Sequence, residues 1–268
     1  MSTKSLQIKR KGNNFMRIAI VTGASSGIGK EFARQIAQLY NKLDEIWLVA
    51  RRTHRLKELQ QELSVPARIF DGDLTGDSIY ERIGKCLESE NIDIRMLVNS
   101  AGFGKVGLLE EADEKGQLGM VDLNCRALTK MCMLCLPYLS RGSRIVNVSS
   151  IAAFVPQPGF AVYAATKSYV HSFSYALAEE LKEKQVNVTV VCPGPVDTEF
   201  FERSGELPGN CRNFVRSRAC NVVRQALKDA VNKKKLSVYS VPVKAARIGA
   251  GLLPSGLTAA VMKKINHI

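Results

Sequence analysis

The stretch TGASSGIG at residues 22–29 decides the fold of this chain. It joins a short apolar run, RIAIV at 17–21, to a helical run, KEFARQIAQLY at 30–40. Its three glycines permit a tight turn and let a ligand approach the backbone closely. A helix that begins at such a loop offers free N–H groups and the positive end of its dipole to a phosphate. The order of strand, glycine loop and helix therefore predicts a site for the pyrophosphate of a dinucleotide.

Two other glycine-loop patterns are excluded by spacing. A P-loop, G-x-x-x-x-G-K-[ST], that included Lys30 would require glycine at position 24 and Ser or Thr at position 31, where Ala24 and Glu31 stand. The loop at 22–29 also does not match the pattern G-x-G-x-x-G. A purely structural turn remains the alternative for a lone glycine loop. The position of this loop between the first strand and the first helix favours the cofactor site.

Apolar runs with β character recur along the chain and are separated by helical segments. After 17–21 they lie at 45–50, 67–71, 96–99, 143–150, 187–193 and 236–241. Continuous apolar strands that alternate with helices are typical of a parallel sheet covered on both faces. The sequence predicts a doubly wound α/β sandwich, Rossmann-like, with about seven strands. Because no linker divides the chain, we expect one domain over residues 16–268, preceded by a flexible basic extension over residues 1–15.

The composition is that of a globular protein. Of 268 residues, 46% are hydrophobic and 24% are charged, and no apolar run approaches the ~18 residues of a membrane span. The N-terminus lacks the apolar centre of a secretory signal, so we expect a cytoplasmic protein without an integral membrane segment. Cys132 and Cys135 form a C-x-x-C inside an apolar run, which favours core thiols over a redox pair. The three histidines are too dispersed to predict a metal site.

The net charge of +13 raises the alternative of a nucleic-acid or membrane partner. The basic residues are spread over the chain rather than gathered in one segment, and no nucleic-acid-binding signature accompanies them. We therefore expect solvated basic faces and no nucleic-acid partner. A few arginines remain candidates for binding a phosphorylated cofactor.

Further motifs follow the glycine loop in order along the chain. They are Asp73-Leu74, NSAG at 99–102, Asn124, Ser150, the pair Tyr163 and Lys167, and PGPVDT at 193–198. Over residues 16 to about 200, this series resembles the short-chain dehydrogenase/reductase family, in its single-domain NADP-preferring branch. One departure is Ser100, which stands where the family motif N-N-A-G has its second Asn.

The resemblance implies a hydride-transferring oxidoreductase with a nicotinamide cofactor and a small-molecule carbonyl or alcohol substrate. The cofactor-binding residues that it implies are Gly23, Ser25, Ser26, Gly27, Ile28, Gly29, Asp73, Leu74, Asn99, Ala101, Gly102, Tyr163, Lys167, Pro193, Gly194, Val196 and Thr198. The catalytic residues that it implies are Asn124, Ser150, Tyr163 and Lys167. In this family the asparagine binds a water that links the lysine to solvent, and the lysine also binds the nicotinamide ribose.

The spacing of Tyr163 and Lys167 carries a chemical argument of its own. Four residues apart on a helix, they lie on one face one turn apart. An ammonium there favours tyrosinate and is expected to lower the pKa of the phenol, which suits a general acid. Ser150 falls at the expected carboxyl end of a strand, where ligands bind in such sheets, and would hold the substrate oxygen. Ser149 is the competitor, but strand alternation is expected to point it elsewhere.

The residues after the second strand favour NADP over NAD. NAD enzymes place an acidic residue there for the ribose 2′-hydroxyl, whereas this chain has Ala50 followed by Arg51 and Arg52. A guanidinium binds a 2′-phosphate well. We expect Arg51 to bind it and Arg52 to assist or to face solvent. The alternative is that both arginines merely begin a solvated helix.

Aromatic and apolar residues fall in the loops beside the expected site, and they indicate an apolar substrate such as a steroid, a 3-oxoacyl compound or an aromatic ketone. They are Phe103, Ile151, Phe154, Phe160, Phe200 and Phe201. Packing of these loops onto the core is the alternative. Residues from 199 to about 220 resemble the mobile substrate lid of the family. The C-terminal run at 249–268 is mildly apolar and basic, and it would contact either a membrane surface or another subunit.

The resemblance also implies a homotetramer or homodimer built on the helices that carry Asn124 and Tyr163. A second class of function is a catalytically silent NADP-binding sensor of the same fold. Such a protein would normally have lost Tyr163 or Lys167, and both are present.

Overall fold

The central element of the fold is a parallel sheet of seven strands, described in a computed structural model that covers residues 15–200, 216–240 and 253–266 with Ser204, Lys244 and Gly249. The strand order is β3-β2-β1-β4-β5-β6-β9. The strands are β1 (Met16–Thr22), β2 (Glu45–Ala50), β3 (Ala67–Asp71), β4 (Ile92–Asn99), β5 (Leu139–Val148), β6 (Asn187–Val191) and β9 (Leu236–Ser237). The predicted doubly wound α/β fold is confirmed. The order of connection reverses between β1 and β4, which is where ligands bind in such sheets.

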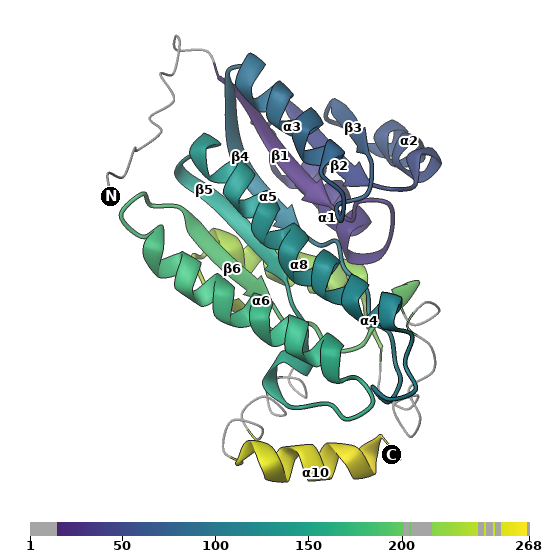
Figure 1. Cartoon of the computed structure of the whole chain (residues 1–268). Helices are drawn as coiled ribbons and strands as arrows, with labels where there is room; N and C mark the ends of the chain where they lie inside the picture. Colours follow the sequence, from purple (N-terminus) through teal and green to yellow (C-terminus); the bar gives the residue numbers. More distant parts are fainter. Residues whose placement is uncertain are drawn as a thin grey trace, which may run out of the picture.

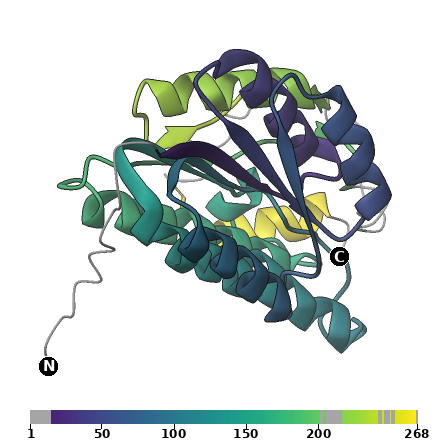
Figure 2. The ribbon, with the colours of Figure 1, turned by 90° about the horizontal axis from the view of Figure 1, so that it is seen from above.

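Helices cover both faces of the sheet (Figures 1 and 2). One face holds α1 (Gly27–Leu39), α2 (Thr53–Glu62) and α8 (Ala219–Val231), and the other holds α3 (Ser78–Ser89), α5 (Leu128–Cys135) and α6 (Ala161–Glu180). Alternation along β1 separates the two layers, because Ile18 and Ile20 pack with the second group while Ala19 and Val21 pack with the first.

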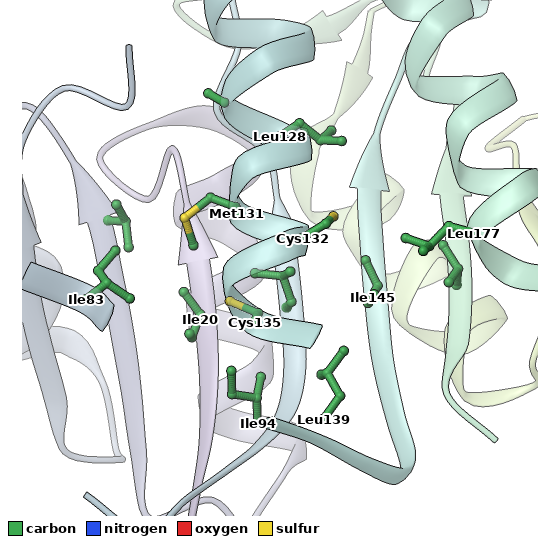
Figure 3. Close-up of a cluster of buried hydrophobic side chains, with 14 of the residues drawn as sticks. Ile20, Ile83, Ile94, Leu128, Met131, Cys132, Cys135, Leu139, Ile145 and Leu177 are labelled. Carbon is green, nitrogen blue, oxygen red and sulfur yellow. The ribbon is translucent and has the colours of Figure 1, made fainter. Parts of the chain in front are cut away.

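The C-x-x-C pair belongs to the core, as predicted. Figure 3 shows Cys132 and Cys135 of α5 among apolar side chains such as Ile20 and Ile145. Both cysteines are buried, and burial raises the pKa of the Cys132 thiol to about 12. A thiol in this state is a poor nucleophile, so the pair has the character of core residues rather than of a redox centre.

Several element boundaries differ from the sequence prediction. β4 begins at Ile92 rather than at residue 96, and β5 ends at Val148 rather than at residue 150. The helix expected around Asn124 is divided into α4 (Glu114–Val121), a π-helical segment (Asp122–Ala127) and α5. The last predicted strand shortens to β9. A small pair, β7 (Val196–Asp197) and β8 (Ser217–Arg218), was not predicted.

The start of β1 and the last described helix lie at opposite ends of the sheet (Figure 1). Most of the predicted N-terminal extension, residues 1–14, and most of the predicted lid, residues 201–203 and 205–215, lie outside the described residues. The last helix, α10 (Ser255–Ile265), crosses the end of the molecule beyond the carboxyl ends of the strands (Figure 1). No helix in the described part of the chain combines the length and the apolar character needed to cross a membrane.

Candidate active site

A cavity of about 1660 Å³ lies where the strands end at their carboxyl termini. Loops after β1, β2, β3, β4, β5 and β6 all contribute to its wall. Every residue predicted to bind the cofactor lines this cavity except Asn99. A single drug-sized ligand typically occupies a pocket of about 300–1,000 Å³. The cavity therefore has room for a dinucleotide and a second small molecule side by side.

The glycine loop is shaped by close backbone contacts. Gly23 has a φ of +69°, and a Cβ atom there would lie 2.8 Å from the backbone nitrogen of Ala101. A Cβ at Gly29 would lie 2.3 Å from the carbonyl oxygen of Gly23. Only glycine fits at these two positions, which hold the start of α1 against the loop after β4.

The N-terminus of α1 faces the cavity with its backbone donors available. Ser26 stands at the N-cap and makes no side-chain capping bond, and the first turn carries no acidic residue. The first N–H groups of a helix lack partners within it, and the helix dipole adds partial positive charge there. This end of the cavity therefore fits the pyrophosphate of a dinucleotide.

Asn99 does not reach the cavity, and its predicted role in binding the cofactor is not supported by its position. Its Nδ2 donates to Asn147 Oδ1 at 2.9 Å and to Cys132 Sγ at 3.3 Å, below the floor of the site. Asn147 Nδ2 in turn donates to Ser174 Oγ at 2.9 Å, and Ser174 Oγ donates to the carbonyl of Val170 at 2.6 Å. This buried relay connects β4, β5 and α6.

The predicted reacting groups meet at one end of the cavity. Tyr163 and Lys167 are both buried on α6, and the hydroxyl of Tyr163 is hydrogen-bonded to the side chain of Ser150. Lys167 Nζ donates to the carbonyl of Val148 at 3.0 Å. Ser150 stands two residues beyond β5, contrary to its predicted place in the strand, and its Oγ accepts from Ala152 N at 3.2 Å. The short 3-10 turn that Ser150 caps holds its hydroxyl toward Tyr163.

The neighbouring Ser149, which was expected to point in another direction, makes a different contact. Its hydroxyl donates to the carbonyl of Lys167 at 2.7 Å and so joins the end of β5 to α6. Ser150 is therefore the serine whose hydroxyl is hydrogen-bonded to Tyr163.

The expected lowering of the tyrosine pKa does not occur. Burial raises the pKa of Tyr163 to about 12, although its hydrogen bond with Ser150 acts in the opposite direction. Burial also lowers the pKa of Lys167 to about 8. Loss of hydration destabilises both charged forms, and this outweighs the attraction expected between an ammonium and a phenolate. The phenol is consequently held protonated at neutral pH.

Asn124 lies behind the reacting groups rather than in the cavity wall. Its Nδ2 donates to the carbonyl of Phe103 at 2.9 Å and to Thr166 Oγ1 at 3.0 Å, and its Oδ1 accepts from Phe103 N at 3.0 Å. A Cβ atom on Gly102 would lie 2.8 Å from this Oδ1. Asn124 thus fixes the loop after β4 against α6, and the π-helical segment brings its side chain to this position.

Two arginines mark the far end of the cavity, after β2. Ala50 ends the strand without a carboxylate, and Arg51 and Arg52 line the cavity wall. Arg51 is 64% exposed and pairs with Asp73 at 3.6 Å. Arg52 is 22% exposed, and its Nε and Nη2 each donate to Ser25 Oγ at 3.2 Å. Arg52 is therefore the more firmly positioned of the two.

A third arginine and a glutamate complete this cluster, and sequence reasoning missed both. Glu199 accepts from Arg52 Nη1 at 2.9 Å and also pairs with Arg55 on the first turn of α2. Partial burial acts to raise the pKa of Glu199, but hydrogen bonds from Arg55 and Arg52 hold it below its usual value. No local pattern links residues 55 and 199, so no signal in the sequence pointed to this contact.

The cavity wall around Tyr163 is apolar. The ring of Phe160 stacks on Tyr163 with centroids 4.2 Å apart, and Phe200 lies 5.5 Å from the same ring. Of the six predicted apolar loop residues, all but Phe201, which lies outside the described residues, line the cavity. Met262 and Ile265 of α10 also line it, and no pattern in the sequence predicted this contact.

Known proteins resemble the chain over most of its length. The family model described as short chain dehydrogenase matches residues 17–207. An uncharacterized oxidoreductase of Staphylococcus epidermidis is 35% identical over 188 residues, which are 69% of this chain and 80% of that protein. A very-long-chain 3-oxoacyl-CoA reductase of Pyricularia oryzae is 34% identical over 213 residues, 74% of this chain and 62% of the relative.

Solved structures share the fold. A short-chain dehydrogenase from Sphingobium yanoikuyae in complex with NADPH has a TM-score of 0.75 and 26% identity, covering 90% of this chain and 94% of that one. A short chain dehydrogenase/reductase from Burkholderia phymatum in complex with NAD has a TM-score of 0.76. At 19% identity, over 87% of this chain and 92% of that one, the second likeness is one of fold alone.

Proposed function

The chain belongs to the short-chain dehydrogenase family of oxidoreductases, and from that premise we propose that it interconverts an apolar ketone and its secondary alcohol with NADP(H). The observation that carries the proposal is the hydrogen-bonded pair of Tyr163 and Ser150 in a cavity that the glycine loop also lines. A proton donor and a phosphate-binding helix end thus share one enclosed space. Hydride-transfer chemistry requires both.

Each reacting residue has a definite task in this proposal. The bound nicotinamide supplies or accepts the hydride at the substrate carbon. In reduction, Tyr163 donates its proton to the carbonyl oxygen, while the Ser150 hydroxyl hydrogen-bonds to that oxygen and orients it. Lys167 lies with its Nζ 5.6 Å from the centre of the Tyr163 ring, where a positive charge stabilises the phenolate left behind. The high pKa of Tyr163 keeps the acid loaded before reaction.

The residues after β2 support NADP rather than NAD. No carboxylate stands at the carboxyl end of β2 to accept a ribose 2′-hydroxyl, because the last residue of the strand is Ala50. Arg51, Arg52 and Arg55 instead gather positive charge there, and a guanidinium binds phosphate with a planar pair of donors. The relatives' cofactors include both forms, so the choice made by this chain is an inference from these side chains.

The wall around Tyr163 supports an apolar substrate. Phe160 and Phe200 flank the tyrosine ring, and Met262 adds a further apolar side chain to the cavity wall. Such a surface gains free energy from burying hydrocarbon and offers little to a charged substrate. A steroid, a 3-oxoacyl compound or an aromatic ketone has the required character.

We also propose a homodimer or homotetramer built on the helices that carry Asn124 and Tyr163. Large apolar side chains are exposed on these helices and on α5 beside them: Leu118, Val121, Met133 and Tyr169. An exposed apolar set of this kind is typical of a subunit contact. Sedimentation equilibrium of the full chain tests this assembly.

The test of the function is a panel of apolar and polar ketones with NADPH, followed by loss of nicotinamide absorbance. Tyr163→Phe keeps the ring that stacks on Phe160 but removes the proton, so turnover on the best ketone should fall at least ~10²-fold. NADPH affinity should stay near that of the parent. Tyr175→Phe, on the same helix but away from the cavity wall, is the matched control and should keep full turnover.

Two outcomes would contradict the proposal. Near-normal turnover by Tyr163→Phe would move the proton donor to another group. Tight NADPH binding without turnover on any ketone or alcohol would favour the silent cofactor-binding sensor.

A further inference from the structure

The outward side of α10 carries an apolar stripe. Leu257 and Val261 are 51% and 44% exposed, and Leu253, two residues before the helix begins, is 47% exposed. The spacing of four residues between Leu257 and Val261 places them on one side of the helix, one turn apart. Thr258 is the only residue within α10 that is buried. A helix that leaves its large apolar side chains in solvent has a surface suited to an apolar partner.

The inner side of α10 forms part of the cavity. Met262 and Ile265 line the wall of the active-site cavity, and Asn266 Nδ2 donates to the carbonyl of Pro158 at 2.8 Å. The helix lies at the outer limit of the molecule, across the end where the strands finish (Figure 1). The apolar stripe and the apolar end of the cavity are therefore two sides of one helix.

Charge identifies the partner. Lys263 and Lys264 are exposed at the end of α10, and the sequence contains no Asp or Glu after Asp229. A two-fold contact between α10 helices would bring lysines of two copies together, and each copy carries a net charge of +13. An anionic lipid surface offers hydrocarbon for the stripe and phosphate groups for the lysines at once.

We propose that α10 lies in the interface of an anionic lipid membrane, with Leu257 and Val261 at the acyl boundary and Lys263 and Lys264 against the lipid phosphates. In this orientation the part of the cavity wall formed by Met262 lies beside the membrane. The apolar ketone or alcohol then enters from the lipid rather than from water. The docking stands on α10 alone, whereas this route of substrate entry rests on the proposed function.

The test of docking is co-sedimentation with vesicles, which does not depend on activity. The full chain should bind vesicles of equal phosphatidylcholine and phosphatidylglycerol, and should bind pure phosphatidylcholine at least tenfold more weakly. Leu257→Gln with Val261→Gln, and separately Lys263→Gln with Lys264→Gln, should each reduce binding to the anionic vesicles at least tenfold. The far-ultraviolet circular dichroism of each variant verifies that it is folded.

Matched controls test whether any exposed apolar or basic side chain on the protein would have the same effect on vesicle binding as those of α10. Leu39→Gln removes a 61% exposed leucine at the end of α1, and Lys85→Gln with Lys228→Gln removes two exposed lysines of α3 and α8. Both controls should bind anionic vesicles like the parent. Equal losses in the controls, or unchanged binding by both α10 variants, would overturn the proposal.

A second copy of the chain is the competing occupant. Sedimentation velocity without lipid tests this alternative. Membrane docking would be contradicted if the parent forms a dimer, the Leu257→Gln, Val261→Gln variant does not, and the two proteins bind vesicles equally well.

The route of substrate entry is tested by turnover of a ketone dissolved in lipid. Anionic vesicles should raise this turnover for the parent and not for the α10 variants. Turnover of a water-soluble ketone should be alike in all of them. Absence of turnover on both ketones would count against the proposed function and leave the vesicle result standing.

Discussion

Arg52, rather than the more exposed Arg51, is held firmly beside the glycine loop. Two of its nitrogens bind Ser25 Oγ, so little side-chain freedom remains to be lost when a phosphate arrives. Arg52→Ala should weaken NADPH binding by about 2 kcal/mol, the range for a charged hydrogen bond, and Arg51→Ala should do so by less. NADH affinity should hardly change.

Fluorescence titration of both cofactors measures these affinities, with Arg141→Ala, an exposed arginine away from the cavity, as the control. Equal losses for NADPH and NADH would show that the arginines support the loop rather than the 2′-phosphate.

Glu199 carries the second prediction at this scale. Its carboxylate pairs with Arg52 and Arg55, so it competes with any phosphate for the same donors. Glu199→Gln removes the negative charge and keeps the shape of the side chain. Since a partly exposed ion pair contributes about 0.2–1 kcal/mol, NADPH affinity should rise up to roughly fivefold. Isothermal titration with NADPH and NADH measures the effect, and a weaker NADPH complex would mean that Glu199 orients the arginines instead.

The residues that sequence reasoning found and missed differ in one physical respect. Tyr163, Ser150 and Gly23 belong to short motifs, in which the spacing along the chain determines which residues are neighbours in the fold. Glu199 reaches Arg55 from 144 residues away, and Met262 reaches the cavity from the last helix. The pKa of Tyr163 was wrongly predicted because four-residue spacing shows proximity to a lysine but not the burial of both groups.

At the scale of elements, α6 holds a lysine whose charge the fold disfavours. The pKa of Lys167 is about 8 in the folded chain and near 10.5 when unfolded. Between these values the unfolded chain binds the extra proton, so the free energy of unfolding contributed by Lys167 increases with pH. Relative to Lys167→Met, the parent should gain about 1.4 kcal/mol per pH unit from about pH 8 upward.

Urea unfolding of the two proteins measures this difference. The pH is varied from roughly 7.5 to 10, because the pKa of Lys167 in the folded chain is about 8. Comparing the pair cancels the titration of groups without a charge interaction with Lys167, such as Tyr80 and Cys132. Parallel stability profiles would show that Lys167 keeps its charge in the folded state.

Element boundaries were harder to predict than element types. The predicted start of β4 was four residues too late, because Asp93 and Arg95 interrupt the apolar pattern. In the structure both residues lie within the strand, and their side chains pair at 3.2 Å. The π-helical segment at 122–127 has no pattern of apolar spacing that distinguishes it from an α-helix. Strands β7 and β8 have two residues each, too few for any periodicity.

For the whole molecule, the fold was predictable because the strands β1, β2 and β6 are buried on both faces along almost their whole length and so carry continuous apolar runs. The N-terminal extension gives the corresponding prediction. Residues 1–14 have no apolar periodicity, so ordering them would cost backbone entropy without burial in return. Their deletion should shift Tm by less than about 2 °C, a change below roughly 1 kcal/mol.

Differential scanning calorimetry of the full and shortened chains makes this comparison, with turnover measured on the same samples. A large fall in Tm would show that the extension docks on the domain.

The buried relay from Asn99 through Asn147 to Ser174 has a consequence for how the chain reaches its native state. Each amide donates to the next group in one direction, from β4 across β5 into α6. If β4 and β5 paired one residue out of step, the apolar side chains would still find apolar surroundings on either face. The amides would not find each other, and unpaired amides in a dry interior are costly. We therefore expect an alignment of β4 and β5 shifted by one residue to be less stable than the native one, because it would separate Asn99 from Asn147.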